Sequence, residues 1–226
     1  MSGQKIKIAV LGGTGDLGGG LAWQLARAGY PVIIGSRGLE KAESAANALL
    51  ERAGASADVT GLANADAAAA ADLVILTVPF ASQMAIVASV RDAVQGKIFV
   101  DATVPLVPPK VMRVQLPEGG SAARLAQDYL GSDVRVVSAF QNVAAAHLNA
   151  DEAHLGECDV LVSGNDKDAR EIVVQLAEEL GMKAWHAGPI DNSAVAESLT
   201  SVLIFMNKRY GFPGAGIKIT GGRAAE

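Results

Sequence analysis

A glycine-rich turn near the start of the chain has the spacing of a loop that binds phosphate. It joins an apolar strand pattern to a helical pattern and consists of Gly13, Thr14, Gly15, Asp16, Leu17 and Gly18. Gly13 would permit the tight turn, Gly15 would let the backbone approach a pyrophosphate, and Gly18 would let the helix pack closely on the strand. The amides and dipole of the helix start would supply the anion site. The turn therefore predicts dinucleotide binding, the alternative being a glycine turn with no such role.

The second strand pattern ends in residues that would choose between NAD and NADP. An NAD site places a carboxylate at this tip to accept hydrogen bonds from the ribose 2′-hydroxyl, whereas this tip carries Ser36 and Arg37. Arg37 could stack on the adenine and pair with a 2′-phosphate, Ser36 could donate a hydrogen bond, and Lys41 would add positive charge one helical turn later. We therefore predict NADP(H) as the cofactor; a solvated basic patch is the alternative.

Further candidate residues follow the later strands. Thr77, Val78 and Pro79 end the fourth strand pattern and would shape the nicotinamide pocket. Residues 101–105 end the fifth, and a substrate would lie between these two strand ends and the segment with Gln141, Asn142 and Val143. Ligands of open α/β sheets bind just beyond the carboxyl ends of the strands, so these segments should meet at one edge. For each of these residues, ordinary loop structure is the competing interpretation.

Hydride transfer is the chemistry that these motifs leave open. The chain has no HExxH motif, no paired cysteines at metal-binding spacing and no nucleophile elbow, so we expect no metal site and no hydrolytic site. Possible proton donors are His147, His154, His186, Lys208 and Tyr210. None stands in a context that marks it, and we assign no catalytic acid or base. An acceptor that is itself a redox coenzyme would not need one.

Strand and helix patterns alternate along most of the chain. We expect strands over residues 6–11, 32–35, 59–62, 73–78, 98–102, 134–140, 160–163 and 183–186. We expect helices over residues 17–28, 40–53, 65–71 with Asn64 as its cap, 82–94, 122–129, 167–180 and 192–211. This βαβ order, with nearly continuous apolar strands, predicts an α/β fold with a Rossmann-like, doubly wound, mostly parallel sheet and a small C-terminal helical part.

The chain divides into two functional parts on this interpretation. Residues 1–137 would form the NADP-binding core, and residues 138–226 a smaller part that packs on the core and forms the acceptor side of a cleft. The segment 103–120 is rich in proline and glycine and is expected to be a loop. The glycine-rich tail over residues 212–222 should pack back over the sheet or onto a second subunit.

Composition excludes several classes of partner. Half of the 226 residues are hydrophobic, and the formal net charge of −5 argues against nucleic acids and anionic membranes. No apolar stretch reaches the length of a membrane span, and residues 1–13 lack the apolar core of a signal peptide. The lone Cys158 cannot form an internal disulfide. We expect a cytoplasmic protein that acts on a small molecule.

Motifs along nearly the whole chain resemble one family. They are AVLGGTGDLGGGLAWQLARAGYPVIIGSR followed by GLEKA, then ILTVPF, DATVPL, VVSAF, GPIDNSAVAESLT and GIKITG. The chain is similar to the F420-dependent NADP oxidoreductases, which transfer a hydride between NADP(H) and the deazaflavin coenzyme F420. The resemblance implies that a set of four residues surrounds the 2′-phosphate end: Thr14, Ser36, Arg37 and Lys41. It implies that Pro79 and Val104 line the nicotinamide, that residues 141–143 face the deazaflavin, and that the protein is a homodimer.

Two residues depart from the family pattern. Gln141 stands where the compared members usually have His, and Gly19 where they often have Lys. The first departure lies on the acceptor side and leaves the NADP prediction untouched. An NADPH-dependent reductase of a flavin, an imine or a carbonyl compound therefore stays open as an alternative. A non-enzymatic module that senses NADP is a second alternative, because no residue is marked as a proton donor.

Overall fold

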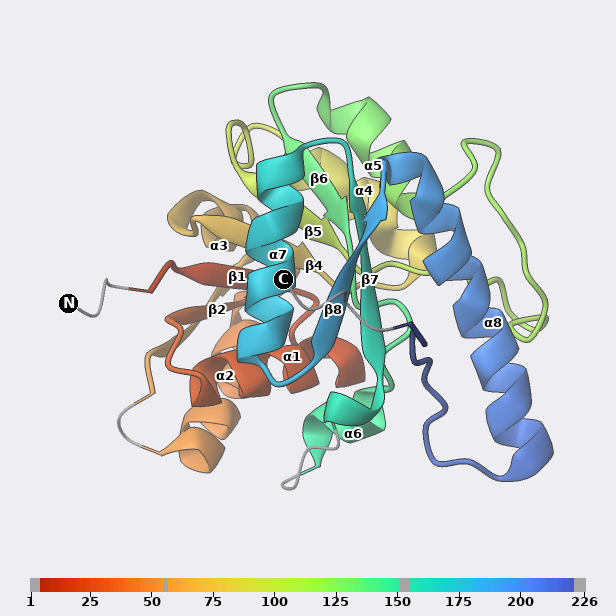
Figure 1. Cartoon of the computed structure of the whole chain (residues 1–226). Coiled ribbons are helices and arrows are strands. Elements are labelled where there is room, and N and C mark those ends of the chain that lie inside the picture. The colour runs from red at the N-terminus through yellow and green to blue at the C-terminus, as the bar shows by residue number, and fades with distance from the viewer. Residues whose placement is uncertain (1–4, 55–56, 151–154, 222–226) are drawn as a thin grey trace.

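A single twisted sheet forms the centre of the molecule (Figure 1). The computed structural model describes residues 5–54, 57–150 and 155–221. Within these ranges, eight strands lie in the order β3-β2-β1-β4-β5-β6-β7-β8. They are β1 (Ile8–Leu11), β2 (Val32–Ser36), β3 (Val59–Ala63), β4 (Leu73–Leu76), β5 (Ile98–Asp101), β6 (Arg135–Ser138), β7 (Asp159–Gly164) and β8 (Lys183–Gly188). All neighbouring pairs are parallel except β6 and β7, so the predicted Rossmann-like, mostly parallel sheet is confirmed.

Helices cover both faces of this sheet. They are α1 (Asp16–Arg27), α2 (Leu39–Ala53), α3 (Asn64–Ala70), α4 (Phe80–Val90), α5 (Ala122–Leu130), α6 (Ala145–Asn149), α7 (Lys167–Glu179) and α8 (Ser193–Tyr210). One apolar core packs α1, α2 and α7 on the sheet, and a second packs α3, α4 and α5 on the opposite face. In β1, Ile8 and Val10 belong to the first core and Ala9 and Leu11 to the second, as side chains alternate along a strand.

The last helix differs from the others in what it buries. The side chains of α8 that are buried are Ser193, Ala196, Glu197, Ser201 and Leu203. Larger apolar side chains of the same helix face outward, among them Val195 and Phe205. Figure 1 shows α8 standing at one side of the sheet, next to the long loop over residues 102–121. The helix α8 therefore buries small and polar side chains and exposes several larger apolar ones.

The chain after α8 returns to the sheet, which agrees with the first of the two expectations for the tail. Asp159, at the start of β7, donates its backbone N–H to the carbonyl oxygen of Ile217 at 2.8 Å. Its side chain accepts a hydrogen bond from the backbone N–H of Ile219 at 2.9 Å. The N–H of Ala215 donates to the Asn207 side chain at 2.7 Å. The tail is therefore held at both ends by hydrogen bonds to described residues.

Most element ends differ from the sequence expectations by a few residues. The expected cap at Asn64 is wrong: Ala63 precedes the helix, no side chain caps it, and Asn64 is its first residue. The helix α4 begins at Phe80, two residues before the expected start, and ends at Val90 instead of residue 94. The strand expected over 134–140 is shorter because Phe140 adopts a left-handed backbone with φ of 73°. The short helix α6 has no counterpart among the expected elements.

Candidate cofactor-binding site

A pocket of about 530 Å³ lies at the carboxyl ends of β1, β2 and β4. Its lining comes from the end of β2, from the turns that follow these strands and from α2, α3 and α4: Gly12, Thr14, Gly15, Ser36, Arg37, Gly38, Lys41, Asn64, Thr77, Val78, Pro79, Ser82 and Ile86. Among the described residues, the lining includes two cationic side chains and no carboxylate. Its position is the one at which doubly wound sheets bind nucleotides.

The glycine turn brings the start of α1 against the sheet. A Cβ on Gly18 would stand 2.4 Å from Thr77 Oγ1 and 2.5 Å from the Gly12 carbonyl oxygen, so only glycine fits this contact. The residue with the left-handed backbone is Gly12, with φ of 86°, one position before the Gly13 that the motif assigned to the tight turn. No side chain caps α1, and its first amides can therefore receive an anion.

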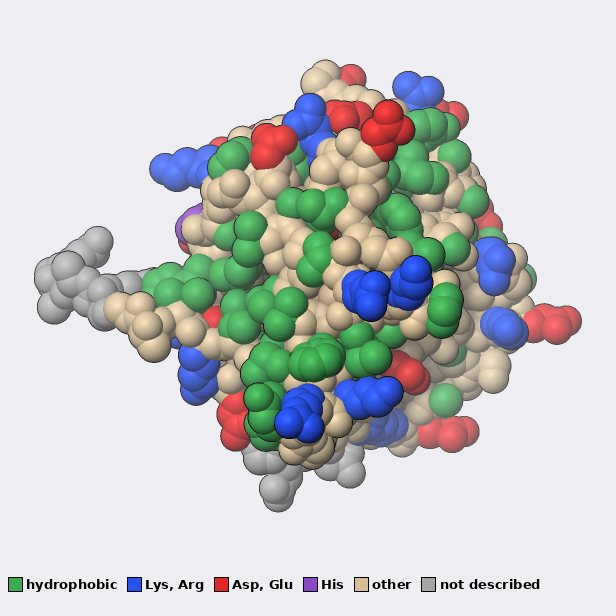
Figure 2. Space-filling model, turned by 90° about the vertical axis from the view of Figure 1, so that its right-hand side faces the viewer, with side chains coloured by type: hydrophobic (Ala, Val, Ile, Leu, Met, Phe, Trp, Pro, Cys, Tyr) green, Lys and Arg blue, Asp and Glu red, His purple; other side chains and the backbone are tan. Residues whose placement is uncertain are grey.

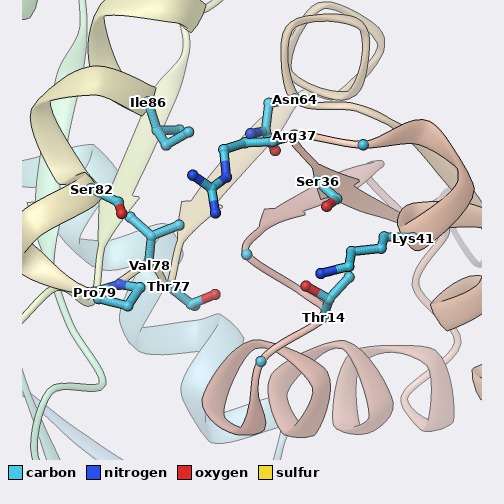
Figure 3. A pocket seen from close by; sticks show the side chains of 13 residues that line it. Thr14, Ser36, Arg37, Lys41, Asn64, Thr77, Val78, Pro79, Ser82 and Ile86 are labelled. Atoms are coloured by element: carbon cyan, nitrogen blue, oxygen red, sulfur yellow. The ribbon is translucent and has the colours of Figure 1, made fainter.

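Basic and polar side chains at the end of β2 face this turn. Figure 3 shows the Arg37 guanidinium extended toward Ile86 and Val78 on the opposite wall, and the Lys41 amine pointing toward Thr14. Ser36 is buried at the strand tip, whereas Arg37 and Lys41 are exposed. This arrangement offers hydrogen-bond donors and positive charge around a hollow, as recognition of a phosphate requires.

The structure brings most of the sequence-predicted cofactor residues to the pocket. Eight of them line it: Thr14, Gly15, Ser36, Arg37, Lys41, Thr77, Val78 and Pro79. Five do not belong to its lining: Gly13, Asp16, Leu17, Gly18 and Val104. Sequence reasoning missed Gly12, Gly38, Asn64, Ser82 and Ile86. For Asn64 a signal was present, because a polar residue directly after β3 lies at the carboxyl edge of the sheet.

The three residues expected on the substrate side are buried. Gln141 is 4% exposed, and its Nε2 donates to the Asp101 carbonyl and to Ser138 Oγ, both at 2.7 Å. The Asn142 side chain donates to the Asp159 carbonyl at 2.7 Å. Val143 packs in the core on the α1 side of the sheet. In this structure, the side chains of residues 141–143 therefore hold neighbouring strands together.

None of the described candidates for a proton donor lines the pocket. His186 is exposed and bonds Glu171 at 2.9 Å, Tyr210 stacks on Phe212, and Lys208 lines a separate hollow beside α8. His147 is half-buried with Nδ1 lacking a hydrogen-bond partner, and His154 lies outside the described residues. The pocket can bind and orient a nucleotide, and its described lining offers no imidazole or carboxyl group as an acid.

The described residues show neither a metal centre nor a membrane span. No three His, Cys, Asp or Glu side chains in that part of the chain gather at a spacing that would hold a metal ion. Within the same ranges, no helix combines the length and the apolar character that crossing a bilayer would require.

Comparisons with known proteins give one consistent result. Residues 7–105 match a family described as NADP oxidoreductase, coenzyme F420-dependent. The chain is 44% identical to an F420-dependent NADP reductase of Methanothermobacter thermautotrophicus over 95% of both chains. It is 42% identical to one of Methanocaldococcus jannaschii, over 95% of this chain and 98% of the relative. A crystal structure described as an F420-dependent NADP reductase from Arthrobacter sp. FB24 superposes with a TM-score of 0.79 at 29% identity, covering 96% of this chain and all of that one.

Proposed function

Since the chain belongs to the family of F420-dependent NADP reductases, we propose that it transfers a hydride between NADP(H) and the deazaflavin coenzyme F420. In the direction of F420 reduction, the nicotinamide gives up a hydride, the deazaflavin ring accepts it, and one proton comes from solvent. The observation that carries this proposal is the sequence identity of 44% and 42% with two of these reductases over 95% of this chain. A transfer between two redox coenzymes also fits a pocket whose described lining lacks an acid.

The NADP half of the site corresponds to the described pocket. Arg37, Ser36 and Lys41 would bind the 2′-phosphate, with Thr14 beside them. The uncapped start of α1 would bind the pyrophosphate through its amides. Thr77 to Pro79, and Val104 after β5, would border the nicotinamide. The backbone positions of these groups are set by β1, β2, β4 and β5, so the nucleotide meets a largely preformed surface.

The acceptor half would come from residues 138–226, which continue the sheet with β7 and β8 and end in α8 and the tail. Within this part, the Gln141 side chain bonds the tip of β5 and the Asn142 side chain bonds the start of β7. Because their side chains are engaged inside the protein, we propose that the deazaflavin meets the backbone and rim of this segment. Residues 1–137 would then supply NADP binding and residues 138–226 the position of the second ring.

Mixing the protein with NADPH and oxidised F420 tests the proposed activity. We expect the absorbance of both coenzymes to fall together at a one-to-one ratio, and no change when either is omitted. FAD, FMN and a panel of imines and carbonyl compounds serve as matched acceptors, for which we expect markedly slower NADPH oxidation. An unchanged spectrum with F420 would overturn the proposal, and faster turnover with a flavin or an imine would support the alternative reductase.

The sensor alternative predicts NADP binding without turnover. A pocket filled by the segment 140–146 would favour it, and none of these residues belongs to the pocket lining. The lining of the described pocket therefore does not favour the sensor alternative.

We also propose that the protein is a homodimer that pairs through the outer face of α8 and works in the cytoplasm. The exposed fractions of Val195, Val202 and Phe205 on this helix are 64%, 45% and 52%. Figure 2, which looks at the side of the molecule where α8 lies, shows hydrophobic side chains spread over this face among Lys and Arg side chains. Burying such side chains against a second copy would remove them from water.

A charge on this face should separate the two copies. Val202→Glu is expected to halve the particle mass measured by light scattering, because a carboxylate would have to be buried at the interface. Ile172→Glu is the matched control, since Ile172 is a similarly exposed apolar residue, at 37%, on α7. A dimeric Val202→Glu variant would place the interface elsewhere.

A further inference from the structure

Two carboxylates are buried between the sheet and α8. Asp101, the last residue of β5, is fully buried, and Glu197 of α8 is 1% exposed. Among the described residues, neither forms an ion pair with a Lys or Arg within hydrogen-bond range. Their oxygens instead accept hydrogen bonds from backbone and side-chain amides. Buried acids without a cation are costly, so a structure that retains two of them invites a functional explanation.

Glu197 joins α8 to the start of α5. Its Oε2 accepts from the N–H of Ala122 at 2.7 Å and its Oε1 from the N–H of Ala123 at 3.1 Å. One turn earlier on α8, Ser193 Oγ donates to Ser121 Oγ at 2.7 Å. The carboxylate thus satisfies amides that a helix start leaves open and sits at the favourable end of the helix dipole.

Gln83 connects the start of α5 to Asp101 and to the cofactor pocket. Its Nε2 donates to the Ala122 carbonyl at 2.8 Å and to Asp101 Oδ2 at 2.6 Å. Gln83 lies on α4 next to Ser82, which lines the pocket. The other oxygen of Asp101 accepts the N–H of Thr103 at 2.8 Å, which fixes the start of the segment that bears Val104. Glu197 is therefore connected to both walls of the nicotinamide side.

Glu197 is also connected to the acceptor side. Thr200 lies about one turn further along α8 and donates its hydroxyl hydrogen to the Gln141 carbonyl oxygen at 2.9 Å. Gln141 in turn donates its side-chain amide to the Asp101 carbonyl. The hydrogen bonds close a loop through α8, the segment after β6 and the tip of β5. A displacement of α8 would change the spacing between the two sides of the cleft.

We propose that Glu197 is a positioning residue for hydride transfer, which holds α8 and the segment 141–143 at the distance from the nicotinamide that ring stacking requires. This inference rests on the proposed function. Glu197 touches neither coenzyme; it acts through Ala122, Gln83 and Asp101. Hydride transfer depends steeply on the distance between the reacting atoms, so a small shift of α8 lowers the rate without weakening NADPH binding.

The charge of Glu197 should control how well it performs this role. Burial raises the pKa of Glu197 to about 7, the negative charge of Asp101 acts in the same direction, and the N–H groups of Ala122 and Ala123 oppose both. Burial also raises the pKa of Asp101. Asp101 from β5 is the charged group that acts on Glu197, and Ser193 on the same helix is uncharged but lowers the pKa of Glu197 through its hydroxyl. The ionised form accepts both amides, whereas the protonated form gives up one acceptor site, so positioning should improve as pH rises through about 7.

Glu197→Gln tests this in single-turnover measurements of hydride transfer from NADPH to F420. The glutamine keeps the shape of the side chain and cannot ionise. We expect the NADPH dissociation constant to stay within about twofold, while the rate ratio of wild type to variant rises from near one at acidic pH to roughly tenfold at alkaline pH. Because wild type and variant use the same coenzymes, any effect of coenzyme titration on the rate is the same for both and cancels in the ratio. Glu179→Gln, an exposed carboxylate paired with Lys5, is the control and should give a flat ratio.

Three results would decide against the inference. A pH-independent ratio for Glu197→Gln, with active wild type, would make Glu197 a structural residue only. If that variant does not fold, Glu197→Asp is the second variant, because it keeps the negative charge on a side chain that is shorter by one methylene group. A rate of hydride transfer equal to that of wild type in Glu197→Asp would also overturn the inference. Wild type that does not transfer a hydride from NADPH to F420 at any pH would overturn the proposed function, and the inference with it.

Discussion

Arg37→Asp is expected to raise the dissociation constant of NADPH by at least about tenfold, which corresponds to about 1.4 kcal/mol. Arg37 extends into the pocket from the end of β2, with Lys41 and Ser36 nearby. The substitution replaces a charge-assisted contact to the 2′-phosphate with repulsion. Because Arg37 is exposed, salt should screen the effect, and the difference from wild type should shrink at high ionic strength. Titration calorimetry or nucleotide fluorescence gives the NADPH dissociation constants of wild type and variant.

NADH provides the matched ligand for this experiment, since it lacks only the 2′-phosphate. We expect Arg37→Asp to leave NADH affinity unchanged or to improve it, because a carboxylate at this tip can accept hydrogen bonds from the ribose hydroxyl. Arg91→Asp, which removes an arginine just after α4, controls for the change in net charge. Unaltered NADPH affinity in Arg37→Asp would show that Arg37 does not bind the 2′-phosphate.

Gly18→Ala is expected to lower the free energy of unfolding by about 2–3 kcal/mol and to abolish measurable NADPH binding. The new Cβ would stand 2.5 Å from the Gly12 carbonyl oxygen and 2.4 Å from Thr77 Oγ1. The Gly12 carbonyl oxygen belongs to the backbone and cannot rotate away, so α1 must move outward from the strands. That movement would carry the first amides of α1 away from the place where they meet the pyrophosphate. Chemical denaturation and nucleotide titration measure the two effects.

Gly19→Ala is the matched control, one residue further along the same helix. Its Cβ would meet nothing closer than the Gly13 carbonyl oxygen at 3.4 Å, an ordinary contact. Alanine also has the higher helix propensity, so stability should stay the same or rise by up to about 1 kcal/mol. Equal stability and binding in Gly18→Ala and Gly19→Ala would contradict the role assigned to the close contact at Gly18.

Much of the fold follows from patterns that depend on local sequence. The strands β1, β2, β4 and β5 are apolar on both faces, which a sequence shows directly and which parallel sheets require. The NADP side follows from the same logic, because Ser36 and Arg37 come directly at the end of a recognisable strand. Gly12 was missed as the left-handed residue because the fingerprint begins at Gly13, and conformation at adjacent glycines is decided by the packing of both neighbours.

The structure around residues 140–143 and Glu197 could not be predicted, because it depends on features that no local sequence pattern reveals. Phe140 adopts a left-handed backbone, which is rare for a large side chain, and the next residue, Gln141, has its side chain inside the protein. Glu197 stands in a helix whose polar residues would ordinarily face water, yet α8 buries Glu197 and exposes Val195. The burial of Glu197 arises from its tertiary contacts with α5, which a helical pattern does not show.

Asp159 joins the tail to the sheet. It marks the start of β7, and its backbone and side chain hold Ile217 and Ile219 of the tail. The N–H of Asp159 donates to the tail, and the N–H of Ile219 donates to Asp159. Both hydrogen bonds break when the tail leaves β7, so the amide hydrogens of Asp159 and Ile219 should exchange with solvent at rates that rise together.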